Sequence, residues 1–159
     1  MDHKFRGRFE AKVDQKGRLL LPLAFRDILK SSPIVITNSQ YQGSRCLDGY
    51  PLKAWEALEK RIGKLSPLKA EVQAFQRFYL ANGQVLEPDG HHRILLPKGL
   101  REFAGLKSEV FLVGMGEKLE IWQADKWNSL HQNLADSFEQ TMSAVANLEN
   151  ENSTGKGQK

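Results

Sequence analysis

Residues 14–26 read DQKGRLLLPLAFR, and residues 89–101 read DGHHRILLPKGLR. When the two stretches are aligned without a gap, their aspartate, first arginine, proline and second arginine coincide. Three consecutive apolar residues also follow the first arginine in both. This recurrence indicates a duplicated unit, and two copies of about 70 residues are too few and too long for a solenoid. We therefore expect a fold built from two related halves.

Each half begins with the same predicted order of elements. Residues 9–13 alternate apolar and polar side chains, which is typical of a half-buried strand. Gly17 permits a turn with positive φ, after which residues 18–21 form a second strand in hairpin order. Pro22 ends that strand and opens a short helix, and residues 34–37 form the next strand. The second half repeats this order from Asp89 onward.

Longer amphipathic helices follow each half. Their apolar residues recur every three or four positions, at Trp55, Leu58, Ile62 and Leu65 and then at Trp127, Leu130, Leu134, Phe138 and Met142. We interpret these stripes as packing surfaces. The first repeat with its helices is expected over residues 5–80, and the second repeat with a C-terminal helix over 81–146. Residues 147–159 are polar and are expected to be disordered.

Composition excludes several classes of protein. The chain has 159 residues and a single cysteine, Cys46, so no disulfide can form within it and a reducing compartment is expected. It contains neither an apolar run long enough for a membrane span nor the apolar core of a secretory signal. We therefore expect a cytoplasmic protein with no membrane contact.

The basic charge is concentrated at one end of the chain. The formal net charge is +4, and residues 1–30 hold eight Lys or Arg against four Asp or Glu, which accounts for the entire excess. Clustered cations produce a stronger field than dispersed ones, so an anionic partner is indicated. A basic surface that serves only solubility is the alternative reading.

The loops that join the repeated aspartate and arginine are the candidate binding elements. Arg18 and Lys16 would project from the first loop, where the planar fork of arginine suits a phosphate or the O6 and N7 atoms of guanine. In the alternative, each aspartate only caps its turn and pairs with the arginine, an exposed contact contributing about 0–1 kcal/mol. The predicted DNA contacts are Arg18, Lys16, Lys12, Arg8, Gln15, Arg93 and His92.

Other chemistry finds little support in the sequence. His91 and His92 are adjacent but lack a third ligand at a metal-site spacing, so a solvated loop is favoured over a metal centre. Cys46 has no histidine nearby in sequence and is expected to lie buried on a strand. Nucleophile-elbow, P-loop and dinucleotide-binding motifs are missing from the sequence. We expect no catalysis, no metal, no cofactor and no small-molecule substrate.

Several segments together resemble the MraZ family of bacterial transcriptional regulators. They are FRG at 5–7, VDQKGR at 13–18, LDGYP at 47–51 and the second Asp89-to-Arg93 copy with the tryptophans after it. The resemblance implies an α+β, β-rich fold of the SpoVT/AbrB-like class. In that fold two swapped-hairpin β-barrel units form an intrachain pseudo-dimer with flanking helices.

The resemblance also implies a function. It implies a nucleoid-associated repressor that assembles into closed homo-oligomeric rings and binds short direct repeats of double-stranded DNA upstream of a cell-division and cell-wall gene cluster. In the family the first loop contacts DNA, which corresponds here to Lys16 and Arg18. Beyond this match, we expect Lys12 and Arg8 to contact phosphate and Arg93 to contribute more weakly. An antitoxin or a self-assembling scaffold without operator specificity is the alternative.

Two features depart from the family pattern. The second loop has His92 where the first has Gly17, and histidine takes positive φ at some cost. Residues 1–4 precede Phe5, at which the family resemblance starts.

Overall fold

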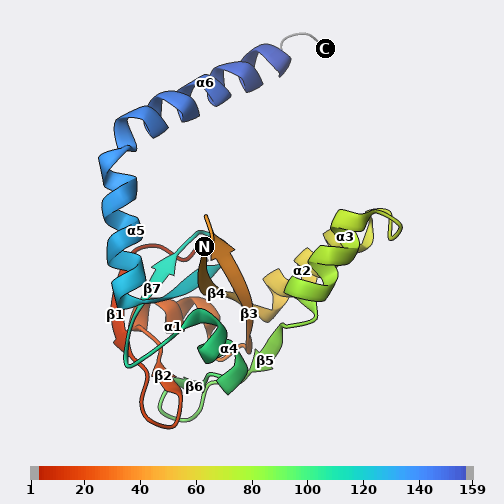
Figure 1. Ribbon diagram of the computed structural model, residues 1–159. Coiled ribbons are helices and arrows are strands. Elements are labelled where there is room, and N and C mark those ends of the chain that lie inside the picture. Colours follow the sequence, from red (N-terminus) through yellow and green to blue (C-terminus); the bar gives the residue numbers. More distant parts are fainter. Residues whose placement is uncertain (1–3, 157–159) are drawn as a thin grey trace. The chain divides into compact units, whose positions relative to one another are not determined.

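The computed structural model describes residues 4–156, which divide into two compact units. The first unit ends at Ala124 and the second begins at Asp125. The first unit has an α+β fold with a six-stranded antiparallel sheet, a separate two-stranded ladder and short helices (Figure 1). The fold class predicted from the sequence is therefore confirmed.

The two halves contribute corresponding elements. The first half supplies β1 (Arg8–Lys12), β2 (Arg18–Leu20), α1 (Leu23–Leu29), β3 (Ile34–Tyr41), β4 (Ser44–Pro51), α2 (Leu52–Gly63), α3 (Ala70–Phe75) and a π-helical turn η1 (Gln76–Leu80). The second half supplies β5 (Gln84–Leu86), β6 (Arg93–Leu95), α4 (Lys98–Ala104), β7 (Glu109–Gly114), β8 (Leu119–Gln123), α5 (Ala124–Asp136) and α6 (Phe138–Lys156). Helices α1, α2 and α4 each begin directly after a proline, whose fixed φ suits a helix start.

Strand pairing exchanges elements between the halves. The sheet order is β1-β7-β8-β4-β3-β5, so β1 of the first half pairs with β7 of the second, and β5 of the second pairs with β3 of the first. β4 and β8 meet at the centre, with Leu47 opposite Ile121. The short strands β2 and β6 form their own antiparallel ladder around Leu19 and Ile94. This exchange produces the intrachain pseudo-dimer that the resemblance implied.

The local hairpin expected from residues 9–13 and 18–21 keeps its turn, in which the backbone nitrogen of Asp14 donates to the carbonyl of Arg18 at 3.0 Å, but its two strands do not pair as a ladder. β1 and β2 share only an isolated bridge between Val13 and Leu19, because β1 pairs with β7 and β2 pairs with β6. The reason is burial: Leu19 and Ile94 face each other across the two halves, and both are fully buried. A local hairpin would leave these side chains without the opposite half of the core.

One apolar core spans both halves, and a smaller one is formed by residues of β3, α2 and η1. Phe25 of α1 stacks edge-on against Phe5 with ring centroids 5.0 Å apart, and both rings are buried. Trp55 of α2 packs with Tyr79 of η1 in the second cluster. Because the main core takes residues from both halves, the two repeats pack as one compact unit that ends at Ala124.

The C-terminal region is more helical than expected. Residues 147–156, predicted to be disordered, continue helix α6, and residues 157–159 lie outside the described residues together with Met1–His3. Polar composition favoured disorder, but the stretch has no proline, so helix α6 continues into it from the preceding turns. None of the helices in residues 4–156 is both long and apolar enough to cross a membrane.

Gly114 gives a direct test of the exchanged packing. A Cβ built at this position would lie 2.6 Å from the backbone nitrogen of Arg6, so Gly114→Ala must displace the segment that carries Phe5. We expect this change to lower the free energy of unfolding by about 1–3 kcal/mol, measured by urea denaturation.

Gly63→Ala is the matched control for this prediction. Gly63 ends α2, and a Cβ there meets no atom within 4 Å, so the variant should be as stable as the parent or slightly more stable. Equal urea midpoints for the two variants would contradict the packing described here.

Candidate nucleic-acid interface

The first loop is organised by the carboxylate of Asp14. Its Oδ1 accepts hydrogen bonds from the backbone nitrogens of Lys16 and Arg18, each at 2.9 Å. Its Oδ2 accepts a third, from Nε of Arg18 at 2.7 Å. Gly17 completes the turn with φ of +89°, a conformation that glycine adopts without steric cost.

The second loop repeats this geometry. Asp89 Oδ1 accepts from the backbone nitrogens of His91 and Arg93 at 2.8 and 3.0 Å, and Oδ2 accepts from Arg93 Nε at 3.0 Å. His92 occupies the position that Gly17 has in the first loop. Its φ is +63°, so this histidine adopts the positive φ that glycine adopts there. The two loops therefore share one backbone design despite this substitution.

Hydrogen bonding keeps both loop carboxyls ionised. The backbone N–H of Arg18 is the main cause that lowers the pKa of Asp14, and the backbone N–H of Arg93 does the same for Asp89. Because an ionised carboxylate accepts without donating, it can hold three N–H groups at once. The loops are thus held by charge-assisted hydrogen bonds at neutral pH.

The first loop leaves cationic groups directed outward. The ion pair with Asp14 uses only Nε of Arg18, so the two terminal nitrogens of the guanidinium are available to a ligand. The Arg18 side chain is 32% exposed, and Gln15 and Lys16 are exposed beside it. Asp14 therefore caps the turn and pairs with Arg18, as the structural alternative predicted. This pair occupies only the Nε of the guanidinium.

Each loop is also attached to the opposite half of the chain. The carbonyl of Gly17 accepts a hydrogen bond from the backbone nitrogen of Leu96 at 2.9 Å, and the carbonyl of His92 accepts one from Leu21 at 3.1 Å. The loops thus flank the ladder of β2 and β6, at the end of the unit drawn lowest in Figure 1. Residues 75 apart in sequence become parts of one surface.

Two arginines that sequence reasoning did not assign to the site support the loops. Nε of Arg26 donates to the carbonyl of Leu21 at 2.6 Å, and Nε of Arg101 donates to that of Leu96 at 3.0 Å. A Cβ on Gly17 would lie 2.8 Å from Nε of Arg101, so this arginine packs directly behind the first loop. The recurrence of Arg26 and Arg101 at equivalent places in both copies could have indicated this role. The contact of Arg101 with the loop of the other half has no signature in the sequence.

The other two predicted residues lie along β1. Lys12 is exposed, ends the strand two residues before Asp14 and stands opposite Glu109 of β7. Arg8 is four residues earlier, about 13 Å along the strand. Its guanidinium lies 5.8 Å from the ring centroid of Phe111. The structure thus gathers Lys16, Gln15, Arg18, Arg93 and His92 around the two loops, with Lys12 adjacent and Arg8 farther away.

A second polar cluster surrounds Asp48 of β4. Asp48 is fully buried, and its Oδ2 accepts from Lys118 Nζ at 2.9 Å and from the hydroxyl of Tyr79. Tyr79 also contacts the hydroxyl of Tyr50 at 2.6 Å. Burial lowers the pKa of the Lys118 ammonium, but the adjacent Asp48 carboxylate outweighs this effect and leaves that pKa raised. The cluster anchors η1 to the centre of the sheet.

The same cluster contains a possible metal-ligating set. Donor atoms of Cys46, Asp48 and Glu120 lie within 4.8 Å of one another. Burial raises the pKa of the Cys46 thiol and that of the Glu120 carboxyl, which favours their neutral forms. The Lys118 ammonium already neutralises Asp48, so the arrangement fits an internal ion pair better than a cation site. Cys46 is buried on β4, as expected.

The comparisons with known proteins agree with the duplicated loops. The sequence model of the family described as "MraZ protein, putative antitoxin-like" matches residues 4–78 and again residues 80–148. The chain belongs to the MraZ family. The two matches coincide with the two halves that exchange strands, so the internal repeat is the family's own repeat.

Individual relatives support the same assignment. The chain is 41% identical over 127 residues to the "Transcriptional regulator MraZ" of Nitrosomonas europaea, a match that covers 78% of this chain and 84% of the relative. It is 35% identical over 144 residues to the protein of that name from Pelotomaculum thermopropionicum, covering 91% and 97%. The protein of that name from Natranaerobius thermophilus is 32% identical over 145 residues, covering 91% and 99%.

The loop geometry predicts how the two carboxyls titrate. Both pKa values lie below the ordinary value of 3.8. The hydrogen bonds to these carboxylates therefore contribute their full stability above pH 3.8. This stability is lost as the pH falls through the lower pKa values of the folded state. Carboxyl-carbon NMR titration of Asp14 and Asp89 should therefore give midpoints below 3.8. A midpoint at or above 3.8 for either residue would contradict the described loop.

The buried cluster gives a separate prediction for stability. Lys118→Met leaves the Asp48 charge buried without its partner and should lower the free energy of unfolding by about 3 kcal/mol. Lys98→Met is the control, because Lys98 forms an exposed ion pair with Glu102 at 3.8 Å, and its loss should cost less than about 1 kcal/mol. Urea denaturation of both variants distinguishes the two environments, and equal effects would show that Asp48 is not held as described.

Proposed function

We propose that this chain is a sequence-specific DNA-binding repressor of transcription, located in the cytoplasm at the nucleoid. The observation that carries the proposal is the pair of matching loops, in each of which an aspartate accepts three hydrogen bonds, two of them from the arginine four residues later, which is thereby held at the surface. Membership of a family whose relatives are named transcriptional regulators supports the same function. Arginine held in this way can bind phosphate or the major-groove edge of guanine.

The first loop is proposed as the main DNA contact. Arg18 is restrained by Asp14 before DNA arrives, so it loses little side-chain freedom on binding. Lys16 is exposed at the tip of the turn and would contact phosphate, with Gln15 beside it as a hydrogen-bonding neighbour. Lys12 and Arg8 would extend the phosphate contacts along β1.

The second loop is proposed as the weaker contact. Residues 14–18 carry two cationic side chains and one carboxylate, whereas residues 89–93 carry one arginine and one carboxylate when the histidines are neutral. Arg93 is 30% exposed and paired with Asp89 as Arg18 is with Asp14. His92 would offer an imidazole N–H to a phosphate from the second loop.

We further propose that several copies form a closed ring that binds short direct repeats. Family membership supports this assembly, and the operator would lie upstream of a cell-division and cell-wall gene cluster. Each chain offers two loops, so contacts along one DNA segment multiply the effective affinity even if each loop binds weakly.

Two alternatives give different results in the same experiment. A self-assembling scaffold would form oligomers without promoter-selective binding of DNA. An AbrB-like antitoxin without operator specificity would bind promoter DNA and scrambled DNA alike. The contrast between the two sequences therefore separates the proposed repressor from both.

The test is a fluorescence-anisotropy titration with the chain's own upstream promoter DNA and a scrambled duplex at two salt concentrations. The parent should prefer the promoter and weaken with salt, with a slope of log K against log salt near −0.9 per phosphate contact. Lys16→Ala should weaken binding to both duplexes about equally and reduce the slope by about 1. Arg18→Ala should lose about 1–3 kcal/mol, mainly on the promoter.

Lys64→Ala is the charge-matched control for these variants. Lys64 is exposed at the end of α2, and its replacement removes the same charge from a surface outside the two loops. Its binding and salt slope should equal those of the parent. The proposal fails if Arg18→Ala keeps the parent's promoter affinity, or if the parent binds both duplexes equally.

A further inference from the structure

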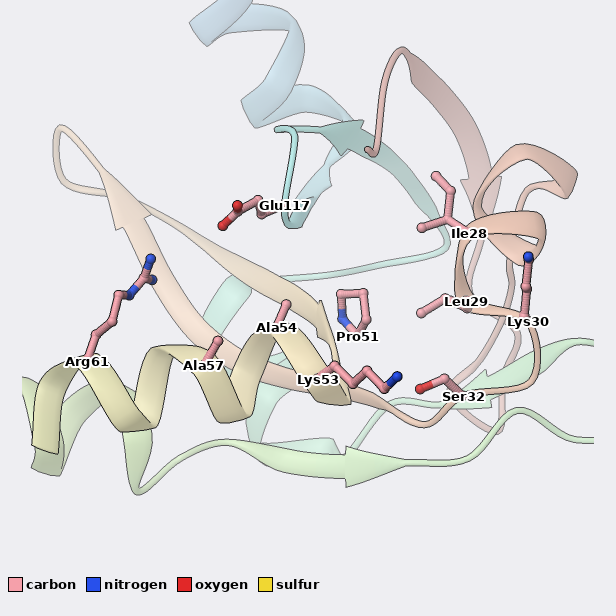
Figure 2. A pocket seen from close by; sticks show the side chains of 10 residues that line it. All are labelled: Ile28, Leu29, Lys30, Ser32, Pro51, Lys53, Ala54, Ala57, Arg61 and Glu117. Carbon is pink, nitrogen blue, oxygen red and sulfur yellow. The ribbon is translucent and has the colours of Figure 1, made fainter. Parts of the chain in front are cut away.

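A groove between α1 and α2 is unused by the proposed DNA contacts. It has a volume of about 460 Å³ and an apolar floor formed by Ile28, Leu29, Pro51, Ala54 and Ala57. Figure 2 shows Ala54, Ala57 and Arg61 on one side of α2, toward the space that Ile28 and Leu29 enter from α1. Small side chains on this side of α2 would allow another helix to approach closely.

The rim of this groove is basic. Lys30, Lys53 and Arg61 line it, with Glu117 as the single acidic residue among the lining side chains. In Figure 2, Lys53 lies at one end of the groove and Arg61 lies farther along α2. An apolar floor with cations at both ends suits an amphipathic segment that carries negative charge.

Helix α6 has the complementary properties. Phe138, Met142, Val145 and Leu148 recur at spacings of four, three and three residues and therefore share one face of the helix. Their side chains are 57%, 54%, 47% and 58% exposed. Four large apolar side chains on one exposed face of a helix indicate a surface that packs against another protein segment.

The charge of α6 is opposite to that of the groove rim. The helix contains Glu139, Glu149 and Glu151, and its only cationic residue is Lys156 at the end. Glu149 follows Phe138 by 11 residues, close to three full turns, so it lies on the apolar face rather than on the opposite side. A carboxylate on this face would meet a cation if the apolar face were buried in the groove.

We infer that α6 of one chain docks in the α1–α2 groove of a second copy of this chain. Phe138, Met142 and Val145 would occupy the apolar floor, and Glu149 would pair with a basic residue of the rim. From Phe138 to Leu148 the helix rises about 15 Å, so three turns provide the apolar contacts. A helix of this polar composition is only marginally stable alone in water and gains stability from such packing.

The interface is heterologous, because each chain offers a groove at one surface and a helix at another. Repetition of such a contact produces a ring if the rotation closes. The inference therefore deepens the oligomer of the proposed function and rests on it, but it does not depend on the DNA contacts. A homotypic pairing of α6 with α6, or the docking of α6 in its own chain's groove, would give different outcomes in the tests below.

The first test uses two variants that each damage one side of the contact. Ala57→Glu places a carboxylate in the groove, and Met142→Glu places one on the apolar face of α6. Light scattering after size exclusion should show each variant alone as an 18.0 kDa monomer and the parent as an oligomer. When mixed, the two variants should form dimers and nothing larger, because one intact groove and one intact helix remain between them.

Leu68→Glu is the control, since Leu68 is 86% exposed and lies outside both surfaces. This variant should keep the parent's oligomeric state. Circular dichroism of every variant shows whether the fold is intact. Loss of oligomers without loss of the fold is the expected result for the first two variants.

Disulfide trapping identifies the contacting surfaces directly. An Ala57→Cys chain mixed with a Val145→Cys chain should yield a product of twice the chain mass on oxidation, while Cys46 stays unreactive because it is buried. A double variant that cross-links only within one chain would overturn the inference, as would an oligomer that survives both glutamate variants. If the parent itself is monomeric, both the ring and this docking fail, whereas promoter binding still tests the DNA proposal separately.

Discussion

The burial of β2 and β6 against each other is the constraint on which the remaining structure depends. Each strand is only three residues long, too short to be stable alone, and Leu19 and Ile94 at its centre are fully buried by the other half. This pairing places the loop before each strand beside the helix of the opposite half. Each loop is positioned by contacts from the other half, so the two halves complete each other.

The loop carboxylates convert that scaffold into a surface suited to DNA. Asp14 and Asp89 each satisfy two backbone donors and one side-chain donor, which fixes the backbone of the turn and the direction of the following arginine. Arg26 and Arg101 support the same region from within by binding backbone carbonyls. Two of the four arginines thus stabilise the fold, and the other two are held at the surface with part of their fork exposed.

The sequence predicts the local parts of this structure well and the exchanged parts poorly. Alternation in residues 9–13, the prolines before the helices and the need for positive φ at Gly17 are local signals, and each corresponds to an observed element or angle. Strand exchange depends on which half fills the core, so the pairing of β1 with β7 has no local signature. The contact of Arg101 behind Gly17 escaped prediction for the same reason, since it depends on context beyond its own neighbours.

Hydrogen–deuterium exchange of the full chain with and without promoter DNA tests the central claim most directly. The account predicts that DNA slows amide exchange in peptides covering residues 14–18 and, more weakly, residues 89–93. Peptides from α2 and α3 should be unaffected by DNA at a fixed oligomeric state, because these helices lie outside the loop surface. Protection confined to α2 and α3, with both loops unchanged, would show that DNA binds elsewhere and would contradict the account.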